Sequence, residues 1–396
     1  MPSPVTTRTL CRGLAAALAC LLAAAAAQPA PLAVVPPTSQ PPATARIVGA
    51  ANAFLATLDS AQRRRVLYAF DDSAQRRRWS NFPTGVVPRG GLSLRELNPA
   101  QRTAALALVS AVLSARGYAK VQQIMDADEV FKETDAKQGP PGARGGSPGD
   151  VRPAGAPPGG GPPGGGSPGG GAGRARLTPD QLFGRDLYYL SILGTPSERT
   201  PWMLQYGGHH LALNLTIAGD RGLLTPSLTG AQPSVYSRNG RTVRPLAGES
   251  DKALALVQAL DASQRAQAVL RYQVADLVLG PGQDGKTIQP EGLRVSAMTA
   301  RQRALLLDVV AEWAGIVHEG AAAARMAELR ADLDQTWFAW SGPIAATPGQ
   351  NITAYYRIQG PHLVIEFAPQ RDDAARHVHT IYRDPTNDYG RAVAGR

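Results

Sequence analysis

Two hydrophobic patterns occur along the chain, and the first of them appears twice. Segments 97–113 (LNPAQRTAALALVSAVL) and 298–314 (MTARQRALLLDVVAEWA) place apolar residues at helical spacing behind a polar capping residue and a glutamine. Segments 58–64 (LDSAQRR) and 260–266 (LDASQRA) repeat the same kind of helix start. A capping residue, a first-turn glutamine and an apolar stripe together predict helices in both parts of the chain.

The second pattern is the alternation of apolar and polar residues that is typical of strands. Segment 186–194 (DLYYLSILG) aligns with 334–342 (DQTWFAWSG), and 205–217 (QYGGHHLALNLTI) aligns with 358–367 (IQGPHLVIEF). The second alignment pairs three positions: Gly208 with Gly360, His210 with His362, and Asn214 with Glu366. Each part of the chain is therefore predicted to run from two helices to an aromatic strand and then to a histidine-bearing strand.

This repeated order predicts one α+β domain over 45–396. Its core is expected to be internally duplicated about a pseudo-two-fold axis, with helices plus antiparallel strands, half one being 45–236 and half two 250–390. Segment 137–176 is rich in glycine and proline, lacks periodicity and has almost no apolar side chains. Such a segment cannot bury enough surface to offset its ordering entropy, so we expect a disordered insert within half one.

The N-terminus has the pattern of an export signal. Arg8 and Arg12 precede an Ala/Leu-rich stretch at 13–27 that is too short to span a bilayer comfortably. We therefore expect a signal peptide at 1–27 and a secreted or periplasmic protein, with a lipoprotein attached through Cys20 as the alternative. Both cysteines, Cys11 and Cys20, lie in this leader, so the mature chain has no disulfide and no thiolate ligand.

The formal charge of +10 does not indicate nucleic-acid binding. The leader carries two of these charges and segment 137–176 carries a net four, which leaves +4 for the remainder. No aromatic residues interleave with the arginines inside the basic runs at 62–65 and 75–78, as a single-strand binder would need. We expect no nucleic-acid partner and no membrane span.

The histidines are the strongest candidates for chemistry. His377 and His379 share a face if their segment is extended, and His210 and His362 are equivalent positions of the repeat. We predict that His210 and His362 meet near the axis, with ring nitrogens about 3–5 Å apart. Because side chains alternate along a strand, we expect His209 to point away from His210.

These histidines and the carboxylate of Glu366 predict a divalent-metal site, with zinc as the first choice and copper as the second. The predicted metal ligands are His210, His362, His377 and His379. Two other interpretations stay open: a polar pocket that binds a small molecule without a metal, and histidines that only satisfy backbone groups.

Further polar residues lie near the histidines in sequence. Glu366, Asp384 and Asp388 are candidate catalytic groups, and the candidate ligand-binding residues are His209, Gln232, Arg383 and Tyr389. The segment holding Asp384 and Asp388 also fits a turn capped by its own side chains. The chain has no His-Glu-x-x-His motif. The favoured function is metal-dependent hydrolysis, and the alternative is an exported, non-catalytic ligand- or metal-binding protein.

Several of these stretches resemble an uncharacterised family, DUF3500. They are QYGGHHLALNLTI, TWFAWSGP, YYRIQGPHLVIEF and HVHTIYRDPTNDYG. The resemblance covers most of the chain outside the Gly/Pro-rich insert, and it implies that these stretches belong to one fold. It implies no activity and no catalytic residue.

Overall fold

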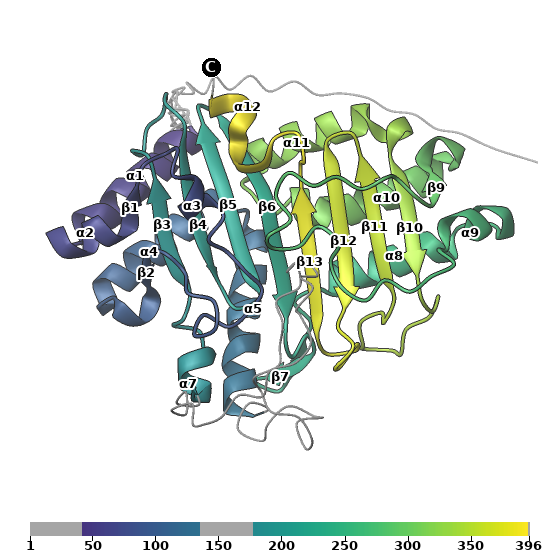
Figure 1. The fold of residues 1–396 in the computed structure, drawn as a ribbon, viewed down its shortest axis with the longest axis horizontal. Helices are drawn as coiled ribbons and strands as arrows, with labels where there is room; N and C mark the ends of the chain where they lie inside the picture. The colour runs from purple at the N-terminus through teal and green to yellow at the C-terminus, as the bar shows by residue number, and fades with distance from the viewer. Residues whose placement is uncertain (1–41, 135–176, 395–396) are drawn as a thin grey trace, which may run out of the picture. The chain divides into compact units, whose positions relative to one another are not determined.

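The computed structural model describes residues 42–134 and 177–394, which belong to one compact unit, Pro41–Arg396. The predicted signal peptide, Cys20 and the predicted insert 137–176 lie outside the described residues. Figure 1 shows a broad sheet with the larger helices behind it. No helix in the described ranges is long and apolar enough to cross a membrane.

The sheet is mostly antiparallel. Its strand order is β1-β3-β4-β5-β6-β13-β12-β11-β10-β9, and β2 also pairs with β3. The strands are β1 (Leu67–Tyr68), β2 (Leu92–Ser93), β3 (Tyr189–Leu193), β4 (Trp202–Gly208), β5 (Leu211–Ala218), β6 (Arg221–Ala231), β9 (Leu293–Arg294), β10 (Trp337–Ser341), β11 (Tyr355–Gly360), β12 (Leu363–Pro369) and β13 (Val378–Arg383). A separate pair is formed by β7 (Tyr236–Arg238) and β8 (Arg241–Val243).

Two antiparallel strands from distant parts of the sequence form the centre of the sheet. β6 pairs with β13, with Thr229 opposite Thr380 and Gly230 opposite His379. The hairpin of β4 and β5 lies beyond β6, and the hairpin of β11 and β12 lies beyond β13. The α+β class and the antiparallel strands are therefore confirmed, and the order of strands is the same outward from the centre on both sides.

The larger helices cover one face of the sheet, whereas the short helix α3 contacts Gln205 on the other face. The helices of the described residues are α1 (Ala43–Ala56), α2 (Ser60–Val66), α3 (Ser73–Arg76), α4 (Pro99–Val112), α5 (Ala115–Glu133), α7 (Pro179–Leu182), α8 (Ala247–Gln258), α9 (Ala262–Ala268), α10 (Ala300–Ala314), α11 (Glu319–Ala331) and α12 (Arg391–Ala394). Trp313 of α10 donates its indole N–H to the hydroxyl of Thr380 in β13, at 3.0 Å, which ties this layer to the central strands. The opposite face carries long loops in place of large helices (Figure 1).

The predicted helix starts form as the sequence indicates. Asp59, Asn98, Asp261 and Thr299 cap α2, α4, α9 and α10, each in a capping box with the glutamine three residues later. These glutamines also bond to each other across helices, Gln62 with Gln101 and Gln264 with Gln302, each pair through both amide groups. Each of these glutamines therefore accepts a hydrogen bond from a free backbone N–H at the start of its helix, and it also joins that helix to another.

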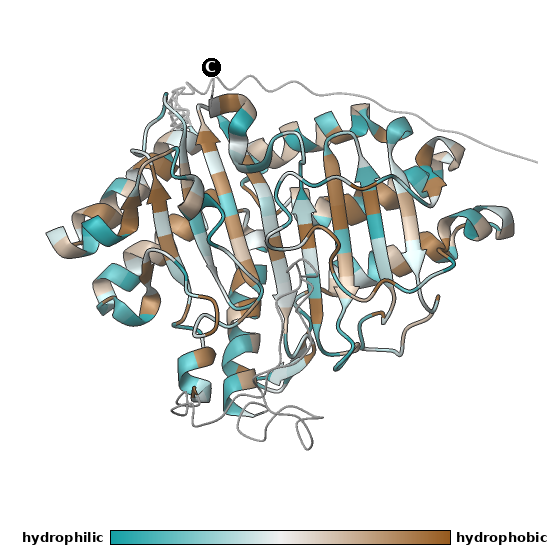
Figure 2. Ribbon diagram, viewed as in Figure 1, coloured by the Kyte–Doolittle hydropathy of each residue, from teal (hydrophilic) through white to brown (hydrophobic). Residues whose placement is uncertain are grey.

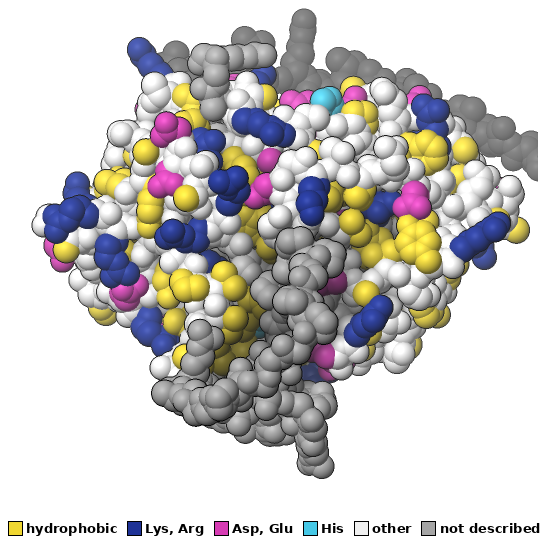
Figure 3. All heavy atoms as spheres, in the orientation of Figure 1, with side chains coloured by type: hydrophobic (Ala, Val, Ile, Leu, Met, Phe, Trp, Pro, Cys, Tyr) yellow, Lys and Arg dark blue, Asp and Glu magenta, His cyan; other side chains and the backbone are white. Residues whose placement is uncertain are grey.

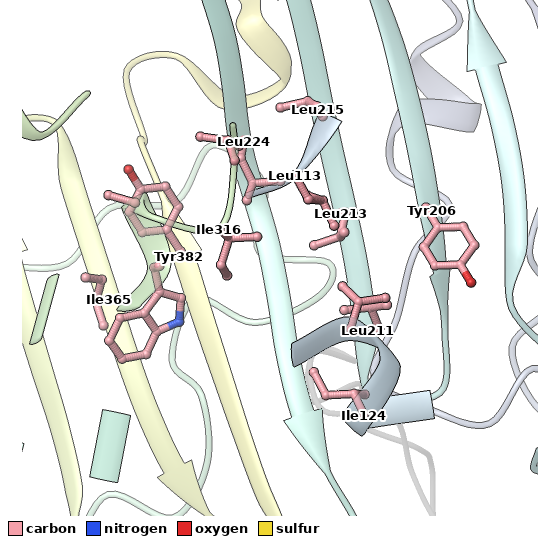
Figure 4. Close-up of a cluster of buried hydrophobic side chains, with 14 of the residues drawn as sticks. Leu113, Ile124, Tyr206, Leu211, Leu213, Leu215, Leu224, Ile316, Ile365 and Tyr382 are labelled. Carbon is pink, nitrogen blue, oxygen red and sulfur yellow. The ribbon is translucent and has the colours of Figure 1, made fainter. Parts of the chain in front are cut away.

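The main hydrophobic core lies between the helices and the sheet. Figure 4 shows part of it, where Leu113 and Ile316 lie among side chains from β5, β6 and β13, including Leu213, Leu224 and Tyr382. Figure 2 shows hydrophobic and hydrophilic residues alternating along several strands, as expected where the two faces differ in environment. Both parts of the chain contribute to this single core, so neither part buries its apolar surface alone.

Candidate metal centre

Three histidines converge at one end of the central strands. The Nε2 atoms of His210 and His377 lie 3.0 Å apart, and those of His377 and His379 lie 3.1 Å apart. One ring nitrogen from each of the three lies within 4.8 Å of the others. His210 and His379 are buried, while the side chain of His377 keeps 14% of its surface exposed. The group is therefore reachable from solvent on one side.

Two different local structures position these rings. His377 immediately precedes β13 and His379 lies within it, so their spacing puts both on one face, as the sequence predicted. His210 closes the hairpin turn between β4 and β5, where Gly208 pairs with Leu211. Its φ of 59° is uncommon for a residue with a side chain, and the hydrogen bond from the Gly230 N–H to its carbonyl, at 2.7 Å, holds it there.

Position 230 requires a glycine because the turn that carries His210 lies close against it. A Cβ there would lie 3.3 Å from Cδ2 and 3.4 Å from Cβ of His210, and 2.8 Å from the carbonyl oxygen of Val378. The small residue lets the turn of one hairpin lie against the strand pair that carries the other two histidines.

Carboxylates lie behind two of the rings. Asp372 accepts from Nδ1 of His377, at 2.9 and 3.0 Å, and Asp276 lies 3.3 Å from Nδ1 of His379. The amide of Asn81 is also 3.3 Å from that Nδ1 atom. An imidazole that donates its Nδ1–H to a carboxylate carries its lone pair on Nε2, the atom that faces the other rings. This is the arrangement that metal-binding histidines use.

The protonation behaviour of the cluster also favours neutral rings. Burial, together with the neighbouring histidines, lowers the pKa of His210 well below its ordinary value. Burial likewise lowers the pKa of His377, to about 4, although Asp372 opposes the shift. Burial raises the pKa of Asp276 and of Asp372, but the hydrogen bonds and charges of His379 and His377, together with backbone hydrogen bonds, outweigh it, and both carboxyls end below their ordinary pKa. At neutral pH these are the charge states that a divalent cation needs.

The geometry fits a small divalent cation. Metal–nitrogen bonds of about 2.0–2.1 Å in a tetrahedral site put ligand nitrogens about 3.3 Å apart. Two of the three nitrogen pairs, at 3.0 and 3.1 Å, are close to this value, and the three nitrogens together lie within 4.8 Å of one another. Three imidazoles leave a fourth tetrahedral position for water or another ligand.

His209 does not point away from His210, contrary to the expectation from strand alternation. The two rings lie against each other, with centroids 3.7 Å apart, because both residues belong to a turn and alternation does not apply there. Nδ1 of His209 contacts Asp128 of α5 at 2.6 Å. The ring of His209 therefore packs against His210, a candidate metal ligand, and its contact with Asp128 ties it to the helix layer.

His362 is the predicted ligand that the structure does not bring to the cluster. It is half exposed in the turn between β11 and β12, and its Nδ1 lies 3.0 Å from the hydroxyl of Thr386. This position is next to Asp384, which follows β13, whereas His379 is near the start of that strand. Five residues of extended chain separate the two ends by roughly 16 Å.

The prediction that His210 and His362 meet at the axis is therefore wrong. β6 and β13 are antiparallel neighbours, so a two-fold axis relating them would run through the sheet and would send equivalent hairpin turns to opposite ends of the strands. The turn of β4 and β5, with His210, and the turn of β11 and β12, with His362, lie at such opposite ends.

The predicted carboxylates also lie away from the histidines. Glu366 is fully buried on β12 and accepts from the N–H groups of Val278 and Leu279 and from the hydroxyl of Tyr355. Asp384 and Asp388 lie at the His362 end of β13. Neither is in position to act on a ligand of the three-histidine cluster, because each is paired at the other end of the strand.

Arg383 and Tyr389 belong to that same network. Arg383 bonds to Asp388 at 2.6 Å and to Asp284 at 3.1 Å, and Tyr389 donates to Asp284 at 2.9 Å. Gln232 lies near the histidines, as His209 does, because its amide is 3.4 Å from the carboxylate of Asp372.

Sequence reasoning missed the residues that orient the rings. Asp372 is five residues before His377, so a hairpin between β12 and β13 could have indicated it. Asp276 and Asn81 lie in loops without periodicity, and their approach to His379 depends on how those loops cross the sheet. No sequence pattern points to them.

The fold and the cluster define an α+β protein with a three-histidine candidate metal centre. The family described as "Protein of unknown function (DUF3500)" matches residues 40–391, so the chain belongs to this family. No curated protein and no solved structure matches the chain.

Proposed function

We propose that this protein binds one divalent cation on His210, His377 and His379, with zinc as the first choice and copper as the second. The observation that carries the proposal is the convergence of their Nε2 atoms, at 3.0 and 3.1 Å, while the opposite ring nitrogens of His377 and His379 face carboxylates. Without a shared proton or a cation, lone pairs at these distances repel each other. A cation removes that repulsion and uses all three atoms.

The test is elemental analysis of protein purified without a histidine tag. We expect roughly one equivalent of metal per chain, and a loss of affinity on the order of a hundredfold or more in His379→Ala. His362→Ala is the matched control, because it removes a histidine at the other end of β13 and should keep the metal. Less than about a tenth of an equivalent after loading, or equal losses in both variants, contradicts the proposal.

Hydrolysis by a metal-activated water is the activity that we propose for this site. Three protein ligands leave a position for water, and a bound divalent cation lowers the pKa of that water towards 7. The second candidate is a non-catalytic metal- or ligand-binding protein. It is favoured by the fact that Asp276 and Asp372, the carboxylates beside the rings, already bond to ligand candidates and are not free as bases.

Turnover by metal-loaded protein separates these two functions. Ester, amide and phosphate substrates should be tested with metal-loaded protein, the chelated protein and the His379→Ala variant. Activity that appears with the metal and disappears in the variant supports hydrolysis. Full metal occupancy without turnover across the panel favours the binding protein.

We propose further that residues 1–27 direct export and that 45–396 is one duplicated domain. Support for the duplication comes from the helix layer, where Leu113 pairs with Val317. The Ser114 N–H donates to Ile316 at 2.9 Å, and the His318 N–H donates to Val112 at 3.1 Å. Ser114 and His318 are both N-caps, of α5 and α11, so the two bonds are equivalent.

N-terminal sequencing of protein recovered outside the cytoplasm tests the proposal that residues 1–27 direct export.

A further inference from the structure

An open cleft lies on the loop-covered face, between segment 272–291 and β11. It encloses ≈ 500 Å³ and has Arg357 of β11 as part of its floor. Its apolar walls include Tyr272 and Val278, which are 50% and 37% exposed and are among the few large hydrophobic residues left this exposed in the described ranges. Figure 3, which views the side opposite the helices, shows such hydrophobic groups among charged ones. Apolar walls around a few polar groups are typical of small-molecule sites.

The corresponding place beside the other hairpin is filled. Gln205 of β4 pairs with Asn214, as Arg357 of β11 pairs with Glu366, each pair three positions from the hairpin turn. There the side chain of Gln75 from α3 bonds to Gln205 at 3.0 Å and to Ser191 at 3.2 Å, and the remaining cavity is ≈ 20 Å³. No described helix takes the place of α3 above Arg357, so the cleft stays open.

The walls of the cleft are held in place by the sheet. Glu366 accepts from the N–H groups of Val278 and Leu279, at 3.0 and 2.8 Å. The Gln359 amide donates to Ile288 at 2.5 Å, and the hydroxyl of Ser341 donates to Tyr272 at 2.8 Å. Bonds at both ends and the middle of segment 272–291 make the cleft a preformed feature rather than a gap under a loose loop.

The polar groups of the cleft form one chain. Glu291 accepts from the Tyr272 hydroxyl at 2.6 Å and from Arg357 at 2.9 Å. Arg357 is 3% exposed, and its Nε atom is buried without a hydrogen-bond partner among the described residues. Such an unsatisfied donor is uncommon in a folded interior, so this floor is short of acceptors.

We propose that this cleft binds a neutral saccharide, through hydroxyl groups on Glu291 and Arg357 and through the apolar face of a sugar ring on Tyr272. Glu291 already neutralises Arg357, and Asp276 adds a negative charge at the wall, so the cleft does not favour an anion. Adjacent sugar hydroxyls both donate and accept, which suits a carboxylate next to a guanidinium. This inference does not rest on the metal centre.

The test is saturation-transfer NMR on the full chain, with methyl β-glucopyranoside, methyl α-mannopyranoside and methyl β-galactopyranoside as probes. Glucuronate, glucosamine and inorganic phosphate are the charged comparators. We expect at least one neutral glycoside to bind, with affinity reduced about tenfold or more in Tyr272→Ala and Glu291→Gln. Glu198→Gln makes the same chemical change at an exposed site outside the cleft and should leave binding unchanged.

Three results overturn the proposal. One is that no neutral glycoside binds, and another is that binding is unchanged in both cleft variants. The third is that a charged comparator binds more tightly than every neutral glycoside. Repeating the titration after chelation should not alter the result, which separates this site from the proposed metal function.

Discussion

The two ends of β13 carry similar residues and use them differently. At the start of the strand, His377 and His379 meet His210 with ring nitrogens facing each other. At its end, Arg383 is surrounded by opposite charge, with Asp388 at 2.6 Å and Asp284 at 3.1 Å. The charged groups at the second end are paired with each other, whereas the first end brings three ring nitrogens together at one place. A cluster of titratable residues therefore indicates a ligand site only where nitrogen or oxygen atoms that are not paired with an opposite charge converge on one place.

The largest expected effect is on stability, at the arginine end. Arg383→Met leaves Asp284 and Asp388 without their buried cation, so we expect the free energy of unfolding to fall by about 3–5 kcal/mol. Denaturant unfolding measures this change. Arg371→Met alters an exposed arginine and should change stability by less than about 0.5 kcal/mol. Metal content of the folded variant should stay at the wild-type level, and its loss would show that the two ends are not independent.

The histidine end should make the metal-free protein sensitive to acid. The pKa of His377 is about 4 in the folded state, below the ordinary value of 6.5, so the unfolded chain takes up this proton first. Stability is then fully present above pH 6.5 and decreases as the pH falls towards 4, by up to about 3 kcal/mol. Chemical denaturation of chelated protein between pH 7 and 4 measures the slope. His377→Gln should flatten it, and an unchanged slope would contradict the buried, neutral ring.

A smaller effect is expected from the carboxylate behind His377, a proposed metal ligand. Asp372→Asn keeps the shape of the side chain but weakens the hydrogen bond that orients His377. We expect metal affinity to fall about 10–100-fold, measured by competition with a chelator of known affinity. Asp373→Asn changes the neighbouring carboxylate, which bonds to no histidine ring among the described residues, and this variant should bind metal normally. Equal effects would assign the loss to general charge instead of orientation.

The smallest effect should come from the histidine that repeat equivalence predicted as a ligand. His362 is half exposed and contacts Thr386 and Asp384. His362→Ala should alter stability by less than about 0.5 kcal/mol and leave metal affinity unchanged. Thermal unfolding with and without metal measures both properties. A metal-dependent loss here would place His362 in the site and reverse the comparison between the two ends.

Local patterns predicted a large part of this structure. The capping residues at Asp59, Asn98, Asp261 and Thr299 begin helices because a cap and its glutamine interact within one turn. The pairing of His377 with His379 followed from the two-residue period of a strand. The same rule failed for His209 and His210, because periodicity holds only inside an element and these residues form a turn.

What the sequence by itself determined are the elements, their repeated order and the histidine pair on β13, since each depends on residues a few positions apart. Only the tertiary structure decided that His210 joins that pair and that His362 does not. The direction of the central strands sets which hairpin turn reaches which end of β13, and it results from burying one face of the whole sheet. The same packing brought Asp276 and Asp128 to the rings from a loop and a helix, contacts that span too much sequence for any local pattern to specify.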